Sequence, residues 1–427
     1  MADFRPFQAL RYNPAVAGNP SDLVAPPYDV VSEADKQVLY ARSPYNISRV
    51  DYGEDRAGDG DSENRYSRAK QQLDDWRAKG VMLVDETPVL YAYDQEFEIH
   101  GERHTRRSIF GKLRLEEFEK GIVLPHEVTG ATAKADRLRI LQATNTHLSP
   151  VMTLYESEGI PAIDDAVLGE PVLDAILNGE RHTLRPINPA AAEAFCAALK
   201  DRRLFIADGH HRYETGINYR NERKAAAASW TGEEPENFIV AALVASDEPG
   251  LIVLPTDRVL NLPDPEVDLA LALSDLFELR KYQSLEELSA AVTAEFKIKP
   301  AFGIVGPGSQ GFTYATPHDI DAVAAAVADH TPADHTDAWR RLDVTILHHA
   351  LLASLGFSET LENIDYTEEH SHAAAAVADG KWDAAFLINP TPVEQVIAVA
   401  GAHDRMPRKS TFFYPKLGTG IVLLPLD

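Results

Sequence analysis

The residues best suited to chemistry stand together in one short stretch of the chain. An apolar run at residues 204–207 is followed by Asp208, Gly209, His210, His211 and Arg212. A strand that ends at a glycine turn and continues into a helix leaves free backbone N–H groups at a positive helix end, where a phosphate binds well. Gly209 lets a ligand approach the backbone. We therefore predict that residues 208–212, called the Asp208 turn below, bind phosphate.

Within this turn the residue types suggest distinct roles. Asp208 is placed to accept a proton or to hold Mg²⁺ beside a bound phosphate. The alternative is structural, because Asp is among the best helix N-caps and histidines are ordinary turn residues. Five such residues in a row favour a site. We predict that Asp208 and His210 are catalytic, that Asp208 is also the metal ligand, and that phosphate is bound by Gly209, His211 and Arg212.

A second cluster follows an apolar run that ends at Pro125. Glu127 lies directly after that run, and partial burial of a carboxyl group favours its use as a general base. The alternative for Glu127 is a loop carboxylate in water. Asp136 and Arg137 follow, and an ion pair on a helix surface is the commoner fate of such residues. We predict that Glu127 is the base and that His126 and Arg137 contact phosphate.

A third cluster lies near the C-terminus, where residues 405–416 contain two arginines, two lysines and two neighbouring hydroxyl side chains. In a chain with a formal charge of −25, this stretch is suited to bind phosphate locally. The alternative is a basic loop that tethers two acidic domains. We predict phosphate contacts from Lys409, Ser410, Thr411 and Lys416. The sequence leaves open whether this stretch reaches the Asp208 turn.

The elements that must position these clusters mix strands and helices. Beyond residue 263 the two alternate, which indicates a mixed α/β fold. The hydrophobic patterns predict a strand at 46–52, an amphipathic helix at 62–79, a hairpin of 89–99 with 104–115, a strand, turn and helix over 204–228, and a long helix at 338–355.

Length and charge limit the architecture and the partners. The 427 residues suit two or three domains, and we predict an N-terminal α/β region (1–85), a core with the Asp208 turn (86–260) and a C-terminal α/β region (261–427) whose basic tail could complete the site. With 41 Lys and Arg against 66 Asp and Glu, the average surface repels a nucleic-acid backbone. A local site for one small phosphate is still allowed, because charges are screened over about 10 Å.

Targeting signals and cysteine chemistry are not evident in the sequence. No stretch approaches the ~20 apolar residues that cross a bilayer, and the start lacks the apolar core of a signal peptide. We expect a cytoplasmic protein without a membrane or nucleic-acid partner, and the oligomeric state stays open. Cys196 lies in an Ala-rich helical pattern, where a buried, inert thiol is the usual occupant.

Several short motifs, taken in chain order, resemble one family over nearly the whole length. The motifs lie at residues 26–30 (Pro-Pro-Tyr-Asp-Val), 125–127 (Pro-His-Glu), 136–138 (Asp-Arg-Leu), 207–215, 406–407 (Met-Pro) and 409–416 (Lys-Ser-Thr-Phe-Phe-Tyr-Pro-Lys). The resemblance is to the bacterial proteins grouped as domain-of-unknown-function family 1015 (DUF1015). That family is named for lacking a known activity, so the resemblance predicts membership more firmly than a reaction.

The element that contains Asp-Gly-His-His-Arg is also similar, more distantly, to that of ParB-like proteins, in particular the free serine kinases. These kinases transfer a phosphoryl group from a nucleotide to the hydroxyl of serine. The resemblance implies a ParB-like core sheet, a glutamate base, an aspartate in the Asp-Gly-His motif and phosphates held at the following helix N-terminus. Asp208 to Arg212 match the motif, whereas Glu127 is chosen by its chemistry alone. This chain is far longer than such kinases.

We therefore expect a phosphotransferase that acts on a small molecule with an alcohol group. The favoured reaction is a nucleotide-dependent kinase reaction of serine metabolism that converts free L-serine to O-phosphoserine, with Mg²⁺ and with ATP, ADP or pyrophosphate as the donor. One alternative is a ParB-like nucleotide-binding protein or sensor without kinase activity. A phosphoryl hydrolase that uses water as the acceptor is the other.

Overall fold

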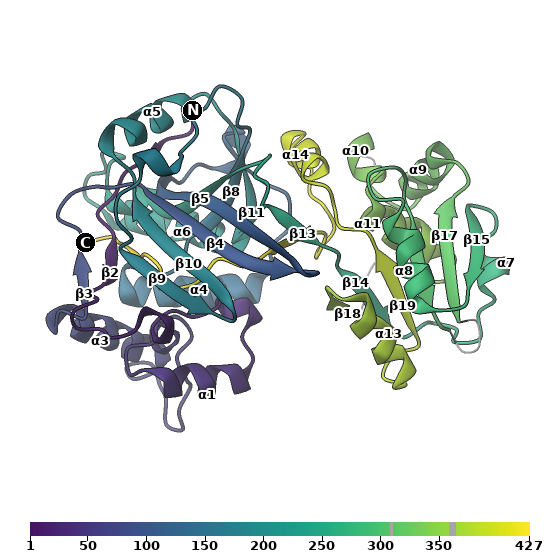
Figure 1. Ribbon diagram of the computed structural model, residues 1–427, viewed down its shortest axis with the longest axis horizontal. Helices are drawn as coiled ribbons and strands as arrows, with labels where there is room; N and C mark the ends of the chain where they lie inside the picture. The colour runs from purple at the N-terminus through teal and green to yellow at the C-terminus, as the bar shows by residue number, and fades with distance from the viewer. Residues whose placement is uncertain (308–310, 333, 358–363) are drawn as a thin grey trace. The chain divides into compact units, whose positions relative to one another are not determined.

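The computed structural model describes residues 1–307, 311–332, 334–357 and 364–427 (Figure 1). The chain divides into two compact units: unit 1 holds residues 1–125, 129–251 and 415–427, and unit 2 holds 126–128 and 252–414. The chain therefore passes between the units at 125–126, 128–129, 251–252 and 414–415. The predicted mixed α/β class is confirmed, whereas the predicted division into three regions stays a prediction. None of the described helices is both long and apolar enough to cross a membrane.

A nine-stranded mixed sheet is the centre of unit 1. The strands follow the order β6-β11-β8-β12-β5-β4-β10-β9, and β1 pairs with β5. β11 runs parallel to β6 and antiparallel to β8, while β12 runs parallel to β8. The strands of unit 1 are β1 (Phe4–Arg5), β2 (Leu10–Tyr12), β3 (Met82–Val84), β4 (Tyr91–Ile99), β5 (Glu102–Arg114), β6 (Val123–Pro125), β7 (Thr146–His147), β8 (Val151–Tyr155), β9 (Leu173–Leu177), β10 (Glu180–Pro186), β11 (Leu204–Asp208), β12 (Phe238–Ala245) and β21 (Leu424–Pro425).

Helices of unit 1 bury apolar side chains against this sheet and against one another. Phe195 of α5 contacts Phe4 and Tyr155 edge to face, so α5 closes one part of the core. A second core surrounds Trp76 of α3 in the N-terminal segment. The helices are α1 (Glu33–Arg42), α2 (Ser48–Asp51), α3 (Arg65–Ala78), α4 (Ala131–Thr144), α5 (Pro189–Leu199) and α6 (His210–Ala226), with 3-10 turns η1 (Pro20–Asp22), η2 (Tyr28–Val30), η3 (Phe118–Lys120), η4 (Asp165–Val167) and η5 (Pro235–Asn237).

The predicted helix at 62–79 and the predicted hairpin are confirmed by α3 and by β4 with β5. The hairpin turns at His100 and Gly101, both of which have positive φ angles of 51° and 80°. The predicted strand at 46–52 is wrong, because α2 lies there. The buried Asn46 side chain accepts from the N–H of Ser48 (3.0 Å) and donates to the backbone oxygens of Asp22 and Val24, so it starts a helical turn.

Unit 2 is built on a six-stranded antiparallel sheet of order β15-β17-β16-β19-β14-β18, and β13 pairs separately with β20. Its strands are β13 (Ile252–Leu254), β14 (Asp257–Leu260), β15 (Phe277–Tyr282), β16 (Phe302–Val305), β17 (Phe312–Pro317), β18 (Ile364–Thr367), β19 (Ala384–Ile388) and β20 (Phe412–Tyr414). Its helices are α7 (Leu269–Leu273), α8 (Leu285–Thr293), α9 (Ile320–Asp329), α10 (Asp337–Arg340), α11 (Asp343–Ile346), the π-helical η7 (Leu347–Leu351), α12 (Leu352–Ser354), α13 (His370–Ala378) and α14 (Val393–Gly401).

The long helix predicted at 338–355 is wrong as a single element, because it is divided into α10, α11, η7 and α12. The break lies at Leu342, whose backbone is extended (ψ 137°) and whose side chain is buried. Trp339 donates its indole N–H to the backbone oxygen of Arg405 (2.7 Å). Burial of these two side chains, which helix propensity does not capture, therefore accompanies the break in the helix.

Candidate functional site

The predicted strand, turn and helix around Asp208 are confirmed. β11 lies between β6 and β8 in the sheet of unit 1, and its pairing with β8 shifts register between Ile206 and Asp208. Gly209 is the N-cap of α6, and no side chain caps the helix there. The alternative in which Asp208 is the N-cap is therefore wrong. Because Gly209 has no side chain, the cap residue itself does not occupy this helix end, which is the kind of position where a phosphate binds well.

Only glycine fits at position 209. Its φ angle is 92°, in the left-handed region that side chains rarely adopt. A Cβ atom there would lie 2.9 Å from Nε of Arg212. The guanidinium of Arg212 thus packs directly over the turn, and the glycine serves both the backbone conformation and this close approach.

Two cations share the carboxylate of Asp208. Arg212 donates from Nη2 to Oδ2 (2.5 Å), and Lys416 donates from Nζ to Oδ1. Burial by itself would raise the pKa of Asp208, but Lys416 and Arg212 outweigh burial and hold that pKa well below its ordinary value. A carboxylate with so low a pKa is a weak base. The geometry thus favours Asp208 as an anchor that fixes two cations at the turn.

The backbone at Lys416 is held in place by two side chains of the sheet. Gln95 donates to the Lys416 carbonyl (3.0 Å), and Arg106 donates to the Pro415 carbonyl (2.5 Å). Gln95 and Arg106 are both fully buried in the sheet of unit 1. The C-terminal stretch therefore reaches the Asp208 turn through Lys416, a contact that the sequence left open.

Arg137 is buried rather than part of a surface ion pair. Its Nη1 donates to Asp51 Oδ1 (2.7 Å) and its Nη2 to Asp136 Oδ2 (2.6 Å), while its guanidinium lies 4.0 Å from the ring centre of Tyr28. Only 7% of the Arg137 side chain is exposed. A buried arginine held from three sides is a preorganised cation.

Asp51 and Tyr28 are the members of this cluster that the sequence reasoning missed. Among the described residues, Asp51 Oδ2 is buried without a hydrogen-bond partner. Burial raises the pKa of Asp51, and the charges of Arg137 and Arg212 oppose that rise. Burial likewise raises the pKa of Tyr28, to about 12, and the charges of Arg212 and Arg137 oppose this rise. Tyr28 belongs to the quoted 26–30 motif, which was a signal for it, whereas Asp51 was hidden by the wrong strand assignment.

The two histidines of the turn have different surroundings. His210 is buried, and its charge contributes to the low pKa of Asp208. His211 Nε2 accepts a hydrogen bond from the N–H of Gly130 (3.0 Å). The carboxylate of Glu214, also in α6, accepts one from the Thr129 hydroxyl (2.7 Å). α6 therefore holds the backbone at 129–130, immediately after the segment that carries Glu127. A phosphate-binding role for His211 stays a prediction.

The remaining predicted residues belong to unit 2. His126 Nε2 lies 2.9 Å from the hydroxyl of Thr411, and its carbonyl accepts the N–H of Met406 (2.7 Å). Glu127 forms a parallel bridge with Met406. His126 and Glu127 of the second cluster thus meet the third cluster within unit 2, whereas Asp136, Arg137 and Lys416 belong to unit 1.

Ser410 and Lys409 have structural partners in that unit. The Ser410 hydroxyl donates to the carbonyl of Pro407 (2.5 Å), and Lys409 has a positive φ of 58°. The Lys409 carbonyl accepts from Arg258 (2.9 Å). Burial lowers the pKa of Arg258 to about 10, and the charge of Glu127 is among those that oppose this shift. Glu127 therefore shares unit 2 with a buried guanidinium.

A magnesium site at Asp208 does not fit the observed contacts. Both carboxylate oxygens accept from a cation, and a divalent ion beside Lys416 and Arg212 would be repelled. In the part of the chain that the structure describes, no group of three or more His, Cys, Asp and Glu residues is arranged to hold a metal. We therefore do not assign Mg²⁺ to Asp208.

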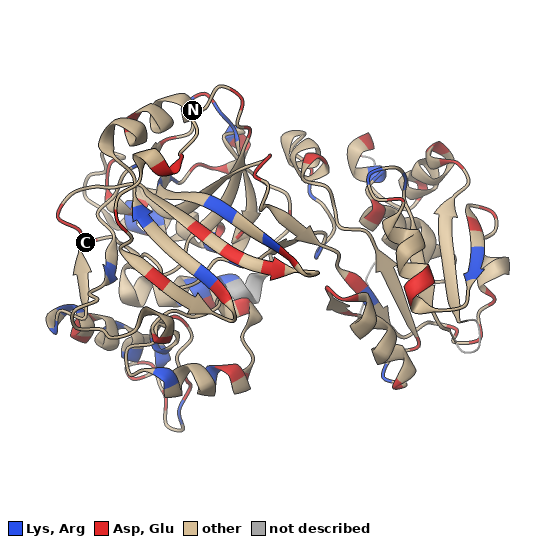
Figure 2. Ribbon diagram, viewed as in Figure 1, with Lys and Arg blue, Asp and Glu red and all other residues tan. Residues whose placement is uncertain are grey.

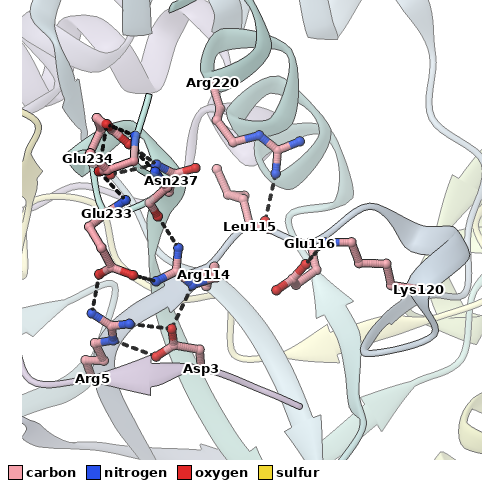
Figure 3. A network of polar contacts seen from close by, with 12 residues as sticks. Asp3, Arg5, Arg114, Leu115, Glu116, Lys120, Arg220, Glu233, Glu234 and Asn237 are labelled. Atoms are coloured by element: carbon pink, nitrogen blue, oxygen red, sulfur yellow. Dashed lines mark hydrogen bonds and ion pairs between the residues drawn. The ribbon is translucent and has the colours of Figure 1, made fainter. Parts of the chain in front are cut away.

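A cavity of about 1150 Å³ lies elsewhere in unit 1, beside β1 and α5. Its charged wall is internally paired, because Asp3 accepts from Arg5 (2.6 Å) and from Arg114 (2.7 Å) and Arg114 also binds Glu233 (Figure 3). Cys196 lines the cavity, and burial raises the pKa of its thiol to about 11. This thiol is protonated at neutral pH, in agreement with the inert role predicted for it.

The family assignment is decided by one comparison. Residues 4–345 match the family model described as "Protein of unknown function (DUF1015)". The chain belongs to the DUF1015 family. The resemblance inferred from the order of its motifs is thereby confirmed, and membership in this family names no reaction.

No curated protein matches the chain. Solved structures that resemble it include a conserved hypothetical protein from Pyrococcus furiosus, with 14% identity, 73% of this chain and 92% of that chain covered, and a TM-score of 0.33. A free serine kinase in complex with AMP has 14% identity, coverages of 72% and 86%, and a TM-score of 0.34. SbnI with a C-terminal truncation, from Staphylococcus aureus, has 9% identity, coverages of 71% and 83%, and a TM-score of 0.35.

Proposed function

We propose that this DUF1015 protein is a phosphotransferase that binds a phosphate group at the Asp208 turn and transfers it to an alcohol, with free L-serine as the preferred acceptor. The observation that carries the proposal is the convergence of Lys416 and Arg212 on Asp208 at the N-terminus of α6. Two cations and one carboxylate give this buried centre an excess positive charge. The N-terminus of α6, whose cap residue Gly209 has no side chain, adds the positive end of a helix dipole to it.

Such a centre suits phosphoryl transfer because that reaction needs positioning and charge stabilisation more than covalent chemistry from the protein. Asp208 keeps the two cations in place before a ligand arrives. Arg137 and Asp51 lie close enough to influence the same electrostatic balance, as the effects on Asp51 and Tyr28 indicate. The phosphate oxygens would accept hydrogen bonds from the N–H groups of α6 and from Arg212 and Lys416.

In the proposed reaction the acceptor hydroxyl oxygen forms a bond to the transferred phosphorus, and the bond from that phosphorus to the leaving phosphate oxygen breaks. The hydroxyl proton goes to a carboxylate that acts as a general base, the role that the sequence predicts for Glu127. ATP, ADP or pyrophosphate supplies the phosphoryl group, and Mg²⁺ enters as the counter-ion of that donor.

The reaction is tested by incubating the purified full chain with Mg²⁺, each donor in turn and a panel of hydroxy amino acids, followed by phosphorus NMR. A new phosphoester signal with serine is expected. Release of free phosphate alone would assign a hydrolase, and donor binding without turnover would assign a nucleotide-binding protein or sensor. Either of these results overturns the kinase proposal.

Replacing Glu127 by Gln removes the proposed base while keeping the size of the side chain. We expect turnover to fall by about 10²- to 10⁴-fold, the usual contribution of a placed base, while donor affinity is unchanged. Glu119→Gln is the matched control, since this carboxylate lies in η3 outside the site. Unchanged turnover in Glu127→Gln would remove Glu127 from the mechanism and leave the Asp208 turn to be judged by its own variants.

A further inference from the structure

A pocket of about 300 Å³ in the N-terminal segment of unit 1 is lined by four arginines. We call it the arginine pocket: Arg49, Arg56, Arg65 and Arg68 face it, together with the carboxylates of Glu54 and Asp75. The lining holds four arginines and two carboxylates. Asp59 pairs with Arg68, and Asp55 and Asp136 pair with Arg65, so within the described part of the chain the guanidinium groups without an ion pair are those of Arg49 and Arg56. Figure 2 shows Lys and Arg residues among the helices of this segment beside Asp and Glu.

The guanidinium groups of two of the four arginines form no ion pair in the described part of the chain, although the backbone N–H of Arg56 donates to Asp59 Oδ2 (3.0 Å). Arg49 donates to the carbonyls of Tyr40 (2.6 Å) and Ser43 (3.2 Å) and lies 4.5 Å from the ring centre of Tyr40. These neutral acceptors orient the guanidinium without cancelling its charge. Arg56 is exposed, and its side chain forms no hydrogen bond or ion pair among the described residues.

The other two arginines fix the walls of the pocket. Arg68 makes a bidentate ion pair with Asp59, with both distances 2.7 Å, and Arg65 donates to Asp136 (2.5 Å). The carboxylates of the pocket are engaged with other groups. Gln37 donates to Glu54 (2.6 Å), and Asp75 pairs with Lys79 (3.6 Å). Glu54 keeps its negative charge because Gln37 is neutral, so Arg49 and Arg56 exceed it by one positive charge, which remains available to a ligand.

We propose that the arginine pocket is a second anion site, which binds a compact tetrahedral dianion, either inorganic phosphate or the phosphate group of a monoester. Planar guanidinium groups match the oxygens of such an anion in pairs, and the volume limits the ligand to a small one. The site is distinct from the Asp208 turn and has no part in the proposed transfer step. Its proposal therefore stands apart from the kinase proposal.

The test is a calorimetric titration of the full chain with inorganic phosphate, repeated with glycerol phosphate as a monoester. We expect Arg56→Gln to weaken binding to this site by about tenfold or more, because one charge-assisted contact is lost. Arg42→Gln is the matched control: it removes the same charge from an exposed position at the end of α1 and is expected to leave binding unchanged. The two titrants distinguish free phosphate from a monoester as the better ligand.

Two further variants separate this site from the Asp208 turn and from a folding defect. Binding that survives Lys416→Met and is lost in Arg56→Gln belongs to the arginine pocket. Arg68→Lys keeps the charge and removes the guanidinium. Its phosphate affinity is expected to lie between that of the wild type and that of Arg56→Gln. Two results would overturn the proposal. One is equal phosphate binding by Arg56→Gln and Arg42→Gln, and the other is complete loss of phosphate binding in Lys416→Met.

Discussion

The Asp208 turn and the arginine pocket are two cationic regions of the same unit, and they balance their charges differently. At the turn, Lys416 and Arg212 share one carboxylate that is almost wholly buried. In the arginine pocket, Arg56 is exposed and Arg49 is held by neutral carbonyl groups. Buried charges interact strongly and are screened little by salt, whereas exposed ones are weakened by water and ions. The turn is therefore built for fixed geometry and the pocket for exchangeable binding.

Among variants of these two regions, the largest effect is expected from Gly209→Ala. The new Cβ atom would meet Nε of Arg212 at 2.9 Å in a left-handed backbone, so both the turn and the arginine must shift. We expect phosphate affinity at the turn and turnover to fall by about 100-fold, the order expected when two charge-assisted contacts are lost. Affinity at the arginine pocket should not change. Calorimetry and the phosphorus NMR assay measure the two quantities.

Gly179→Ala is the matched control for that variant. Gly179 has a similar φ of 87°, but a Cβ atom there meets nothing within 4 Å. This control therefore has the backbone cost, roughly 1 kcal/mol of stability, without the crowding. If Gly179→Ala and Gly209→Ala lose activity equally, the close approach of Arg212 has no functional importance.

Lys416→Met should have the next largest effect. Asp208 would keep Arg212 alone, and the centre would lose its excess positive charge. We expect phosphate affinity at the turn to fall by about 10- to 100-fold. Lys70→Met removes the same charge from an exposed pair with Asp74 and should leave affinity unchanged. Equal affinities in the two variants would exclude Lys416 from the phosphate site.

Acid should affect both regions, because each holds a carboxylate with a lowered pKa: Asp208 at the turn and, beside the arginine pocket, Asp59, whose pKa is lowered to about 2 by its hydrogen bonds with Arg68. The folded pKa of Asp208 lies below the ordinary value of 3.8, so its ionised form stabilises the fold above that value and this stabilisation is lost as pH falls through the lower folded pKa. The Asp208→Asn variant lacks this stabilisation of the fold at every pH. The difference in Tm between wild type and Asp208→Asn should therefore be largest near neutral pH and shrink as pH falls below about 4. A difference that is constant with pH would contradict the assigned pKa direction.

Salt should produce the smallest effect, and it should weaken phosphate binding more at the arginine pocket than at the turn. Phosphate binding to the turn is measured in Arg56→Gln, and binding to the pocket in Lys416→Met. Between about 0.05 and 0.5 M NaCl we expect the pocket to lose a few-fold more affinity than the turn, because its charges are less buried. A steeper salt dependence at the turn would reverse the comparison.

The sequence predicted the parts of this site that are contiguous in the chain. The run from β11 through Gly209 to α6 has a local pattern of apolar residues, turn and helix, and the structure has it at the predicted place. Lys416 was identified as a cation of interest, but its contact with Asp208 joins positions 208 residues apart. Such a contact depends on the sheet that holds Gln95 and Arg106, which local patterns do not describe.

Other features could not be read locally for similar reasons. Asp51 lies in α2, where the buried Asn46 side chain starts a helical turn in a sequence that favours a strand by propensity. The segment 126–128 belongs to unit 2 although the chain on both sides of it belongs to unit 1. Both outcomes follow from tertiary contacts that outweigh local preference.

The most direct test of the central claim is a crystal structure of the full chain grown with pyrophosphate or a nucleoside polyphosphate. We predict phosphate oxygens within about 3 Å of the first N–H groups of α6 and of the Arg212 and Lys416 side chains. A turn that stays empty while the same ligand is bound elsewhere on the protein would contradict the claim that the Asp208 turn is a phosphate receptor.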